Sequence, residues 1–198
     1  MRFRHIARSG RFVRVAHPDW RRPLDPSFAA ARGGRWNPPG SFPVLYLCAT
    51  LAVARAVVLG RFEGLPYGLL DLRPDRRPVL IETDVPLHRA VDVVTEAGCR
   101  AASLPISYPY DARGRKIGWE RTQPLGQTAW GQGERSIACR TAALPKDGDG
   151  EELAWFVRER ADRLAVSARR SFDDWFSRDA PEHEEGLEPA RPGYTAKR

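Results

Sequence analysis

The sequence predicts one α+β domain with a mixed sheet and flanking helices. The chain has 198 residues, the length of one medium domain. Hydrophobic residues make up 42% and charged residues 29%, as in soluble globular proteins. Short apolar runs typical of strands are interrupted by helical runs, without the regular spacing of βαβ units. We expect the domain over residues 1–178 and a disordered, polar, proline-containing tail over residues 179–198.

The first elements are short strands. Phe3–Ala7 and Phe12–Val15 alternate between apolar and polar residues, which predicts two strands. His17–Arg32 is rich in proline, aspartate and arginine, so we expect a loop. In Gly33–Gly40, a glycine pair, a proline pair and a closing glycine predict a shaped backbone that is neither helix nor regular strand.

A strand, a helix and a second strand follow. Val44–Cys48 is a short apolar run and predicts a buried strand. Ala49–Phe62 is rich in alanine, leucine and valine and predicts a helix, with Thr50 as its N-cap. Pro78–Val85 gives the clearest strand pattern, and Leu87–Thr95 is expected to be a short helix or an irregular turn.

The middle of the chain contains a loop, a helix and a strand. Ser103–Arg115 holds two prolines and a glycine and is expected to be a loop. Trp119–Gly131 predicts a helix, and Pro124 places its start near Gln123. Ser136–Arg140 predicts a strand.

The last elements are short. Lys146–Glu152 is an acidic, glycine-containing stretch that we expect to be a loop. Leu153–Val157 and Arg163–Ser167 predict strands. Ser171–Phe176 predicts a short aromatic turn or helix.

The positive charge comes almost entirely from arginine. The net charge is +7, and the only lysines are Lys116, Lys146 and Lys197. Arginine suits phosphates and carboxylates, although an arginine-preferring genome gives the same composition. No aromatic residues interleave with a basic helix, and there is no helix-turn-helix or zinc motif. We therefore do not expect direct binding to nucleic acid.

Cysteines and histidines are too few and too scattered for a structural site. Cys48, Cys99 and Cys139 lie far apart in apolar surroundings, and no two of the four histidines have ligand spacing. We expect no disulfide framework and no metal. No apolar run approaches the ~20 residues of a membrane span, and the N-terminus has no signal-peptide pattern. We expect a cytoplasmic protein that does not bind membranes.

One motif is specific. Gly34-Arg35-Trp36-Asn37-Pro38-Pro39-Gly40, followed by Leu45-Tyr46 and an alanine-rich helix, resembles the RES-domain family. Members are toxins of RES–Xre toxin–antitoxin pairs, with a fold similar to ADP-ribosyltransferases. The resemblance implies a toxin that cleaves the nicotinamide–ribose bond of NAD, by hydrolysis or phosphorolysis, or transfers ADP-ribose. NAD would be the substrate, with no other cofactor. It also implies an Xre-type antitoxin as partner, and leaves a homodimer open.

The resemblance also assigns site residues. Arg35 would bind the NAD diphosphate, and Tyr46 would stack on nicotinamide or hydrogen-bond across the site. Both would be catalytic and NAD-binding, with Trp36 and Asn37 beside them as further binding residues. Thr141 would hold the ligand or position the attacking group, with Ser136 as the alternative.

The expected carboxylate is missing from its usual place. The family's helix glutamate, which would stabilise the ribosyl cation, falls at Val57. Glu63 is six residues further on, about 9 Å along a helix, and Glu82 and Glu120 are the other substitutes. The alternative is a catalytically impaired RES-fold module that binds NAD, another nucleotide or an antitoxin without turnover.

Overall fold

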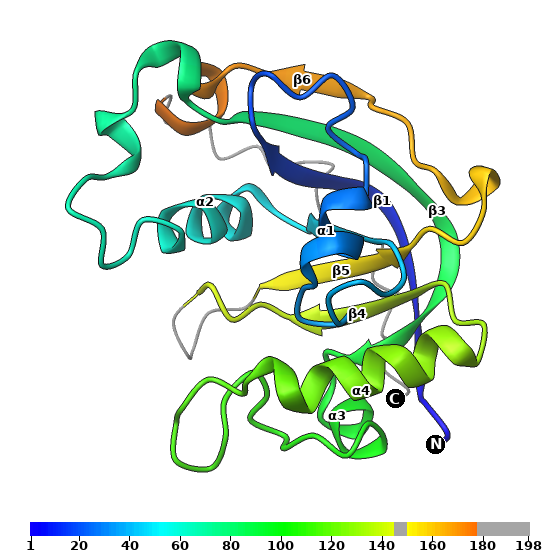
Figure 1. Cartoon of the computed structure of the whole chain (residues 1–198). Helices are drawn as coiled ribbons and strands as arrows, with labels where there is room; N and C mark the ends of the chain where they lie inside the picture. The colour runs from blue at the N-terminus through cyan, green and yellow to red at the C-terminus, as the bar shows by residue number, and fades with distance from the viewer. Residues whose placement is uncertain (145–149, 178–198) are drawn as a thin grey trace, which may run out of the picture.

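The computed structural model describes residues 1–144 and 150–177 (Figure 1). Its centre is one six-stranded sheet in the order β1-β2-β5-β4-β3-β6. The strands are β1 (His5–Ala16), β2 (Val44–Cys48), β3 (Val79–Val93), β4 (Ser136–Arg140), β5 (Glu151–Phe156) and β6 (Ala168–Arg170). The fold is therefore α+β with a mixed sheet, as the sequence predicts.

The sheet closes on itself through β1. This strand pairs antiparallel with β3 from His5 opposite Val91 to Ala16 opposite Val79. It also pairs with β2, but only at Val13 opposite Cys48. Figure 1 shows the long β1–β3 ribbon curving over the shorter strands β2, β5 and β4. The single β1–β2 pairing leaves the ladder open on either side of it.

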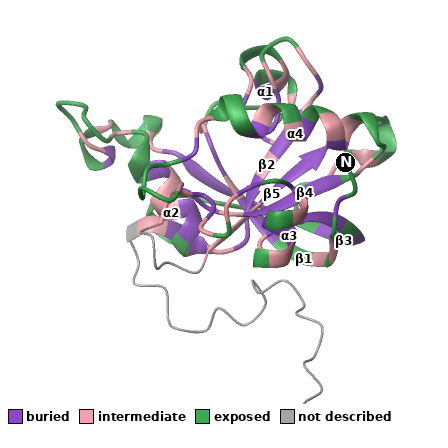
Figure 2. Ribbon diagram, turned by 90° about the horizontal axis from the view of Figure 1, so that it is seen from below, coloured by how far each residue is buried: buried purple, intermediate pink, exposed green. Residues whose placement is uncertain are grey.

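Helices cover one face of this sheet. Helix α2 (Leu51–Gly60) packs in a cluster with the β1 and β3 residues Val13 and Leu80, and α4 (Trp119–Gly131) packs on β2 and β5 residues. Figure 2 shows the buried residues concentrated along the strands. The shorter helices are α1 (Ser27–Arg32) and α3 (Glu96–Ala101), with 3₁₀ turns at Leu69–Asp71, Pro74–Arg76 and Arg160–Asp162 and a π turn at Asp173–Ser177.

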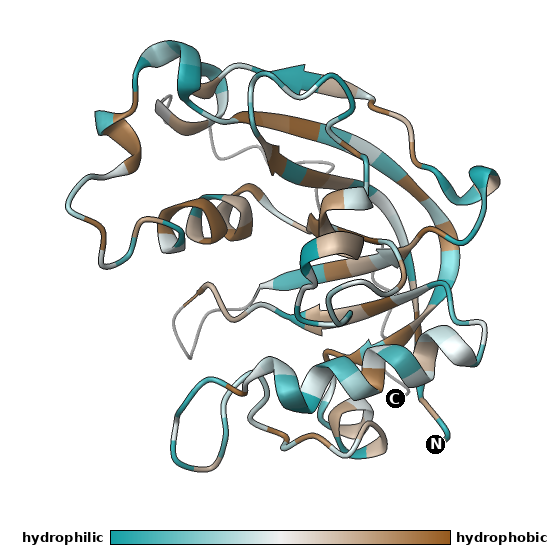
Figure 3. Ribbon diagram, in the orientation of Figure 1, coloured by the Kyte–Doolittle hydropathy of each residue, from teal (hydrophilic) through white to brown (hydrophobic). Residues whose placement is uncertain are grey.

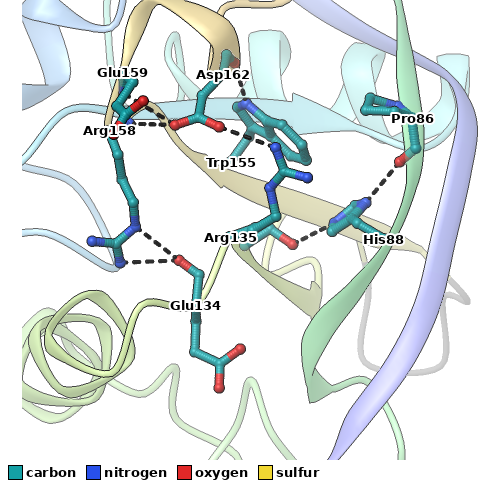
Figure 4. A network of polar contacts seen from close by, with 9 residues as sticks. Pro86, His88, Glu134, Arg135, Trp155, Arg158, Glu159 and Asp162 are labelled. Atoms are coloured by element: carbon teal, nitrogen blue, oxygen red, sulfur yellow. Dashed lines mark hydrogen bonds and ion pairs between the residues drawn. The ribbon is translucent and has the colours of Figure 1, made fainter.

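The opposite face holds a second apolar cluster and a polar network. Leu45, Leu153 and Trp155 pack together there. His88 bonds the Pro86 carbonyl at 2.9 Å and the Ser136 hydroxyl at 2.6 Å. Figure 4 shows His88 beside Arg135 and Trp155, with Asp162 further away and bonded to Arg135. Burial lowers the pKa of His88, which favours its neutral form in this network on the far side from α2 and α4.

The N-terminal predictions need two corrections. The two short strands are one, β1, with an irregularity between Arg8 and Gly10. The expected loop His17–Arg32 contains α1, because Ala29 packs inward and its neighbours are good helix formers. The strand Val44–Cys48 and the Thr50 cap are confirmed, since the Thr50 Oγ1 accepts from the Val53 N–H at 3.2 Å.

The later predictions need more correction. A helix or turn over Leu87–Thr95 is wrong, because β3 runs on to Val93 along β1. Helix α4 begins at Trp119 rather than near Gln123, and contains Pro124. The strand predicted at Arg163–Ser167 lies at Ala168–Arg170, where pairing with Leu80–Glu82 fixes it. The expected tail over residues 179–198 lies outside the described residues.

Three plain observations complete the fold. The three cysteines are free and buried. Within residues 1–144 and 150–177 there is no cluster of three metal-ligating side chains. In the same ranges, no helix has the length and apolarity needed to cross a membrane.

Candidate active site

A pocket of about 930 Å³ lies over the face of β2 and β5 that the helices cover. Its size is within the usual range of small-molecule sites. Helix α2 forms an apolar wall, and Figure 3 shows that this helix is mostly hydrophobic. Polar and charged groups converge from the other sides. The residues that supply these groups are Arg14, His17, Arg35, Tyr46, Arg61, Arg76, Lys116 and Glu152.

The glycine–proline segment Gly33–Gly40 shapes one side of the pocket. Gly33 has φ +77°, which favours glycine. Gly34 lies against Tyr46, and a β-carbon at position 34 would be 2.5 Å from the Tyr46 hydroxyl oxygen. Helix α4 fixes this segment, because the Thr122 hydroxyl donates to the Arg35 carbonyl at 2.5 Å and the Gln123 amide donates to the Gly34 carbonyl at 2.9 Å.

Arg35 projects from this segment into the pocket. Its side chain is partly buried, and one Nη1 hydrogen is donated to the Ile117 carbonyl at 3.3 Å. That bond orients the guanidinium and leaves its other donors available to a ligand. Among the described residues, no carboxylate lies within ion-pair distance of it. Its charge does reach Glu152, as the pKa of that carboxyl reflects.

Tyr46 is fixed by its hydroxyl. The hydroxyl donates to Asn37 Oδ1 at 2.7 Å and accepts from the Trp36 N–H at 2.9 Å. Burial raises its pKa well above the usual range, so the phenol stays neutral. Because the hydroxyl is engaged with the chain itself, the arrangement favours a ring contact with a ligand over a hydrogen bond across the site.

Replacing Tyr46 by phenylalanine is expected to lower the free energy of unfolding by about 1–3 kcal/mol, because the Trp36 N–H and the Asn37 amide oxygen would lose a partner in a buried place. Urea unfolding measures this. Tyr67→Phe, at an exposed tyrosine, is the matched control and should change stability little. Equal stability of the Tyr46→Phe variant and wild type would show that water replaces the hydroxyl.

Trp36 and Asn37 support the site from behind. Trp36 is 1% exposed and Asn37 is fully buried, and neither lines the pocket. The Asn37 amide nitrogen donates to the Ala29 carbonyl at 2.7 Å, while its oxygen accepts from Tyr46. The family resemblance implies NAD binding for both residues. The structure gives them a position from which they hold Tyr46.

The pocket contains a carboxylate that the sequence reasoning missed. Glu152 stands on β5 opposite Cys48 of β2 and Cys139 of β4, so it shares a sheet face with Tyr46. It is partly buried and lines the pocket. Burial raises its pKa, while a hydrogen bond from Thr141 and the charge of Arg35 act in the opposite direction.

Thr141 forms a hydrogen bond with this carboxylate. Its hydroxyl donates to Glu152 Oε1 and accepts from the Ala143 N–H at 3.1 Å. Thr141 is 4% exposed and does not itself line the pocket, although Ala142 and Ala143 do. It therefore lies where it can orient Glu152. Ser136, the alternative hydroxyl, is bonded to His88 on the opposite face of the sheet.

The three substitutes named from the sequence lie elsewhere. Glu63 and Glu120 are exposed and do not line the pocket. Glu82 is buried, but it pairs with Arg170 and, at 3.3 Å, with Arg11. Val57 does line the pocket and forms part of its apolar wall.

One signal in the sequence points to Glu152. Residues 152, 154 and 156 alternate with Leu153 and Trp155, so a strand that starts at Glu151 places Glu152 on the face opposite Trp155. The sequence predicts a loop over Lys146–Glu152 and a strand over Leu153–Val157, so the predicted strand starts one residue after Glu152. The observed strand is Glu151–Phe156 and includes it.

Comparison with known proteins agrees with this description. The fold resembles a chain from the crystal structure of the M. tuberculosis MbcT–MbcA toxin–antitoxin complex, with a TM-score of 0.65 and 22% sequence identity. The match covers 83% of this chain and 85% of that one. Among curated proteins, no significant match is found. The RES domain family matches residues 11–175, and the chain therefore belongs to the RES-domain family.

Proposed function

We propose that this protein is a RES-type toxin that cleaves the nicotinamide–ribose bond of NAD. The observation that carries the proposal is that Arg35, Tyr46 and Glu152 face one pocket of about 930 Å³. The pocket combines an apolar wall with a few convergent polar groups, as small-molecule sites do. Membership of the RES family supports the same reading, since this family is generally NAD-degrading.

Each of the three residues has a chemical role in this reaction. The Arg35 guanidinium would bind the diphosphate, and the Tyr46 ring would pack on nicotinamide. The bond between nicotinamide and ribose C1′ breaks, and nicotinamide leaves with the electron pair. The ionised Glu152 carboxylate would stabilise the positive charge that develops on the ribose. Oxygen of water or phosphate then forms the new bond to C1′, and water gives up a proton.

The test measures NAD loss by the purified protein, with and without phosphate, beside Arg35→Ala. We expect Arg35→Ala to lower kcat/KM at least tenfold, because a charge-assisted diphosphate contact is lost. Arg32→Ala removes an exposed arginine that does not line the pocket, and should retain wild-type activity. A dependence on phosphate would identify the acceptor. Equal activity of Arg35→Ala and wild type would refute the assignment of Arg35.

Val57 favours a second candidate, a RES-fold module that binds NAD without cleaving it. The resemblance would place the family's helix glutamate at Val57, whose isopropyl group lines the pocket and cannot stabilise a cation. The same experiment separates the two candidates. NAD binding that Arg35→Ala abolishes, together with no NAD loss over hours, would favour the binding module.

An antitoxin is the proposed protein partner. The similar solved chain comes from a toxin–antitoxin complex. Arg14, Arg35, Arg61, Arg76 and Lys116 around the pocket suit an acidic segment that blocks it. The test is co-purification with the product of an adjacent gene that encodes a helix-turn-helix protein. A complex that leaves NAD loss unchanged would refute blocking of this pocket.

A further inference from the structure

A second depression, separate from the pocket over β2 and β5, lies on the segment that joins α3 to α4. Its volume is about 460 Å³, and Figure 1 shows the joining segment as a loop beside the start of α4. The residues that line it are Ser103, Leu104, Pro105, Asp111, Ala112, Arg113, Arg115 and Arg121. None of them lines the larger pocket. Three arginines therefore gather at a place that the proposed reaction does not use.

Among the described residues, Asp111 is the only carboxylate that lines this depression, and its oxygens are already engaged. Oδ1 accepts from the Arg113 and Arg115 backbone N–H groups at 2.8 and 2.9 Å, and Oδ2 accepts from Arg115 Nε at 3.0 Å. The backbone hydrogen bond from Arg115 is the largest of the effects that lower the pKa of Asp111, so its carboxylate stays ionised near neutral pH. The same contacts fix the Arg115 guanidinium, which has further N–H donors for a ligand.

The other two arginines of the depression are not neutralised by the described chain. Arg113 and Arg121 are exposed, and within residues 1–144 and 150–177 neither side chain makes a hydrogen bond or has a carboxylate within 4 Å. Glu120 precedes Arg121, but its carboxylate lies over Gly118 and does not line the depression. By contrast, the exposed Arg100 on α3 has an ion pair at 2.9 Å within its own helix. The depression thus carries an excess of positive charge.

The exposure of these arginines favours a protein segment over a small molecule as the occupant. Small-molecule sites bury most of their ligand. Here the guanidinium groups face water, where one ion pair contributes only about 0–1 kcal/mol. Several carboxylates on one chain would bind together, and apolar groups of that chain could cover Ile106, which is 45% exposed directly after Pro105. Guanidinium and carboxylate groups also match through two parallel hydrogen bonds.

We propose that Arg113, Arg115 and Arg121 form a docking surface for an acidic segment of a protein partner. The inference does not depend on the proposed reaction. The surface is nevertheless connected to the larger pocket through the chain, because the Ile117 carbonyl accepts from Arg35 at 3.3 Å. The residues between are held as one turn, in which the Asp111 N–H donates to the Arg115 carbonyl at 2.8 Å. A partner docked here contacts the segment that orients Arg35 and leaves the larger pocket open.

The experiment measures the fluorescence anisotropy of a labelled hexaglutamate peptide with the full chain, at low and constant ionic strength. We expect Arg113→Gln and Arg121→Gln each to weaken binding about threefold, the effect of one exposed ion pair, and the double variant about tenfold. Hexaglutamine should not bind. Arg21→Gln removes an exposed arginine that lines neither the depression nor the pocket, and should bind as wild type does. Arg61→Gln, which removes a cation of the larger pocket, should also bind as wild type does.

Four results would overturn the proposal. The first is a wild-type protein that does not bind hexaglutamate, and the second is unchanged binding by the double variant. Equal weakening in Arg21→Gln would mean that only net charge matters, and a loss in Arg61→Gln alone would place the peptide in the larger pocket.

A competition and a melting curve complete the test. A single-stranded oligodeoxynucleotide that binds through Arg113 and Arg121 more tightly than hexaglutamate would assign the surface to nucleic acid and refute a protein partner. Both single variants should melt at the wild-type temperature, because neither side chain is bonded within the described chain. Reduced binding is then a loss of contact and not of folding. None of these readouts requires NAD cleavage, so failure of the proposed function leaves them interpretable.

Discussion

Replacing Glu152 by glutamine is expected to lower kcat for NAD cleavage by about 10²–10³-fold, the usual effect of removing one electrostatic group that stabilises a transition-state charge. The same variant should melt at a higher temperature than wild type at pH 7–8. Burial raises the pKa of Glu152, so ionising it costs more in the folded protein than in the unfolded chain. Glutamine keeps the shape and can still accept from Thr141.

The pH dependence follows from the same shift. Because the folded-state pKa lies above the unfolded one, the stability of wild type relative to Glu152→Gln is greatest below the unfolded pKa and is lost as pH rises through the folded pKa. The gain in melting temperature should therefore shrink toward pH 4. Activity of the wild type should fall on the acid side at a higher pH than an ordinary glutamate would give.

Glu151→Gln is the matched control. Glu151 is the next residue on β5, but its carboxylate accepts from Arg8 Nη2 at 2.7 Å and from Arg8 Nε at 2.5 Å. It does not line the pocket. Removing this bidentate pair should lower the melting temperature and leave NAD cleavage intact. A loss of activity in Glu151→Gln equal to that in Glu152→Gln would contradict the assignment, as would an active Glu152→Gln enzyme.

Gly34→Ala is expected to reduce stability and activity together. The new methyl group would overlap the Tyr46 ring, with separations of 2.5–2.7 Å from its Oη, Cε2 and Cζ atoms. Tyr46 cannot turn away without losing its bonds to Trp36 and Asn37. Overpacking of this kind costs about 1–3 kcal/mol. A displaced Tyr46 and a shifted Arg35 should lower kcat/KM by about 10²-fold.

Urea unfolding and NAD-loss kinetics on the same preparation measure both effects. Gly131→Ala provides the control, because a β-carbon there, at the end of α4, meets open space. This helical position should become slightly more stable and keep full activity. A Gly34→Ala protein with wild-type kinetics would show that the segment carrying Arg35 tolerates the displacement.

The sequence predicts the parts of this protein whose signals are local. Val44–Cys48 is an uninterrupted apolar run, and the glycine–proline segment with Arg35 is specific enough to indicate the family. The far half of β3 is different. Leu87 and Arg89 are exposed on a strand that follows β1, so only a partner about 80 residues away makes that segment a strand.

The place of Glu152 in the site also depends on strands that are distant in the sequence. Its position depends on pairings with both β2 and β4, which bring it to the face of Tyr46. Residue types alone cannot distinguish it from Glu82, whose ion pairs with Arg11 and Arg170 arise from the β1–β3–β6 pairing. Proposing Glu152 as the carboxylate of the site therefore required the sheet order.

That sheet order also sets when a growing chain could become active. Arg35 and Tyr46 leave the ribosome more than a hundred residues before Glu152, and Phe172 and Trp175 of the α2 cluster follow later still. At 5–20 residues per second, the interval between Tyr46 and Glu152 is about 5–20 s. Throughout it, the nascent protein holds half of its site on a sheet that is not yet closed. If the proposed function holds, the site is complete only once Glu152 has been made, which would leave time for a proposed partner to bind first.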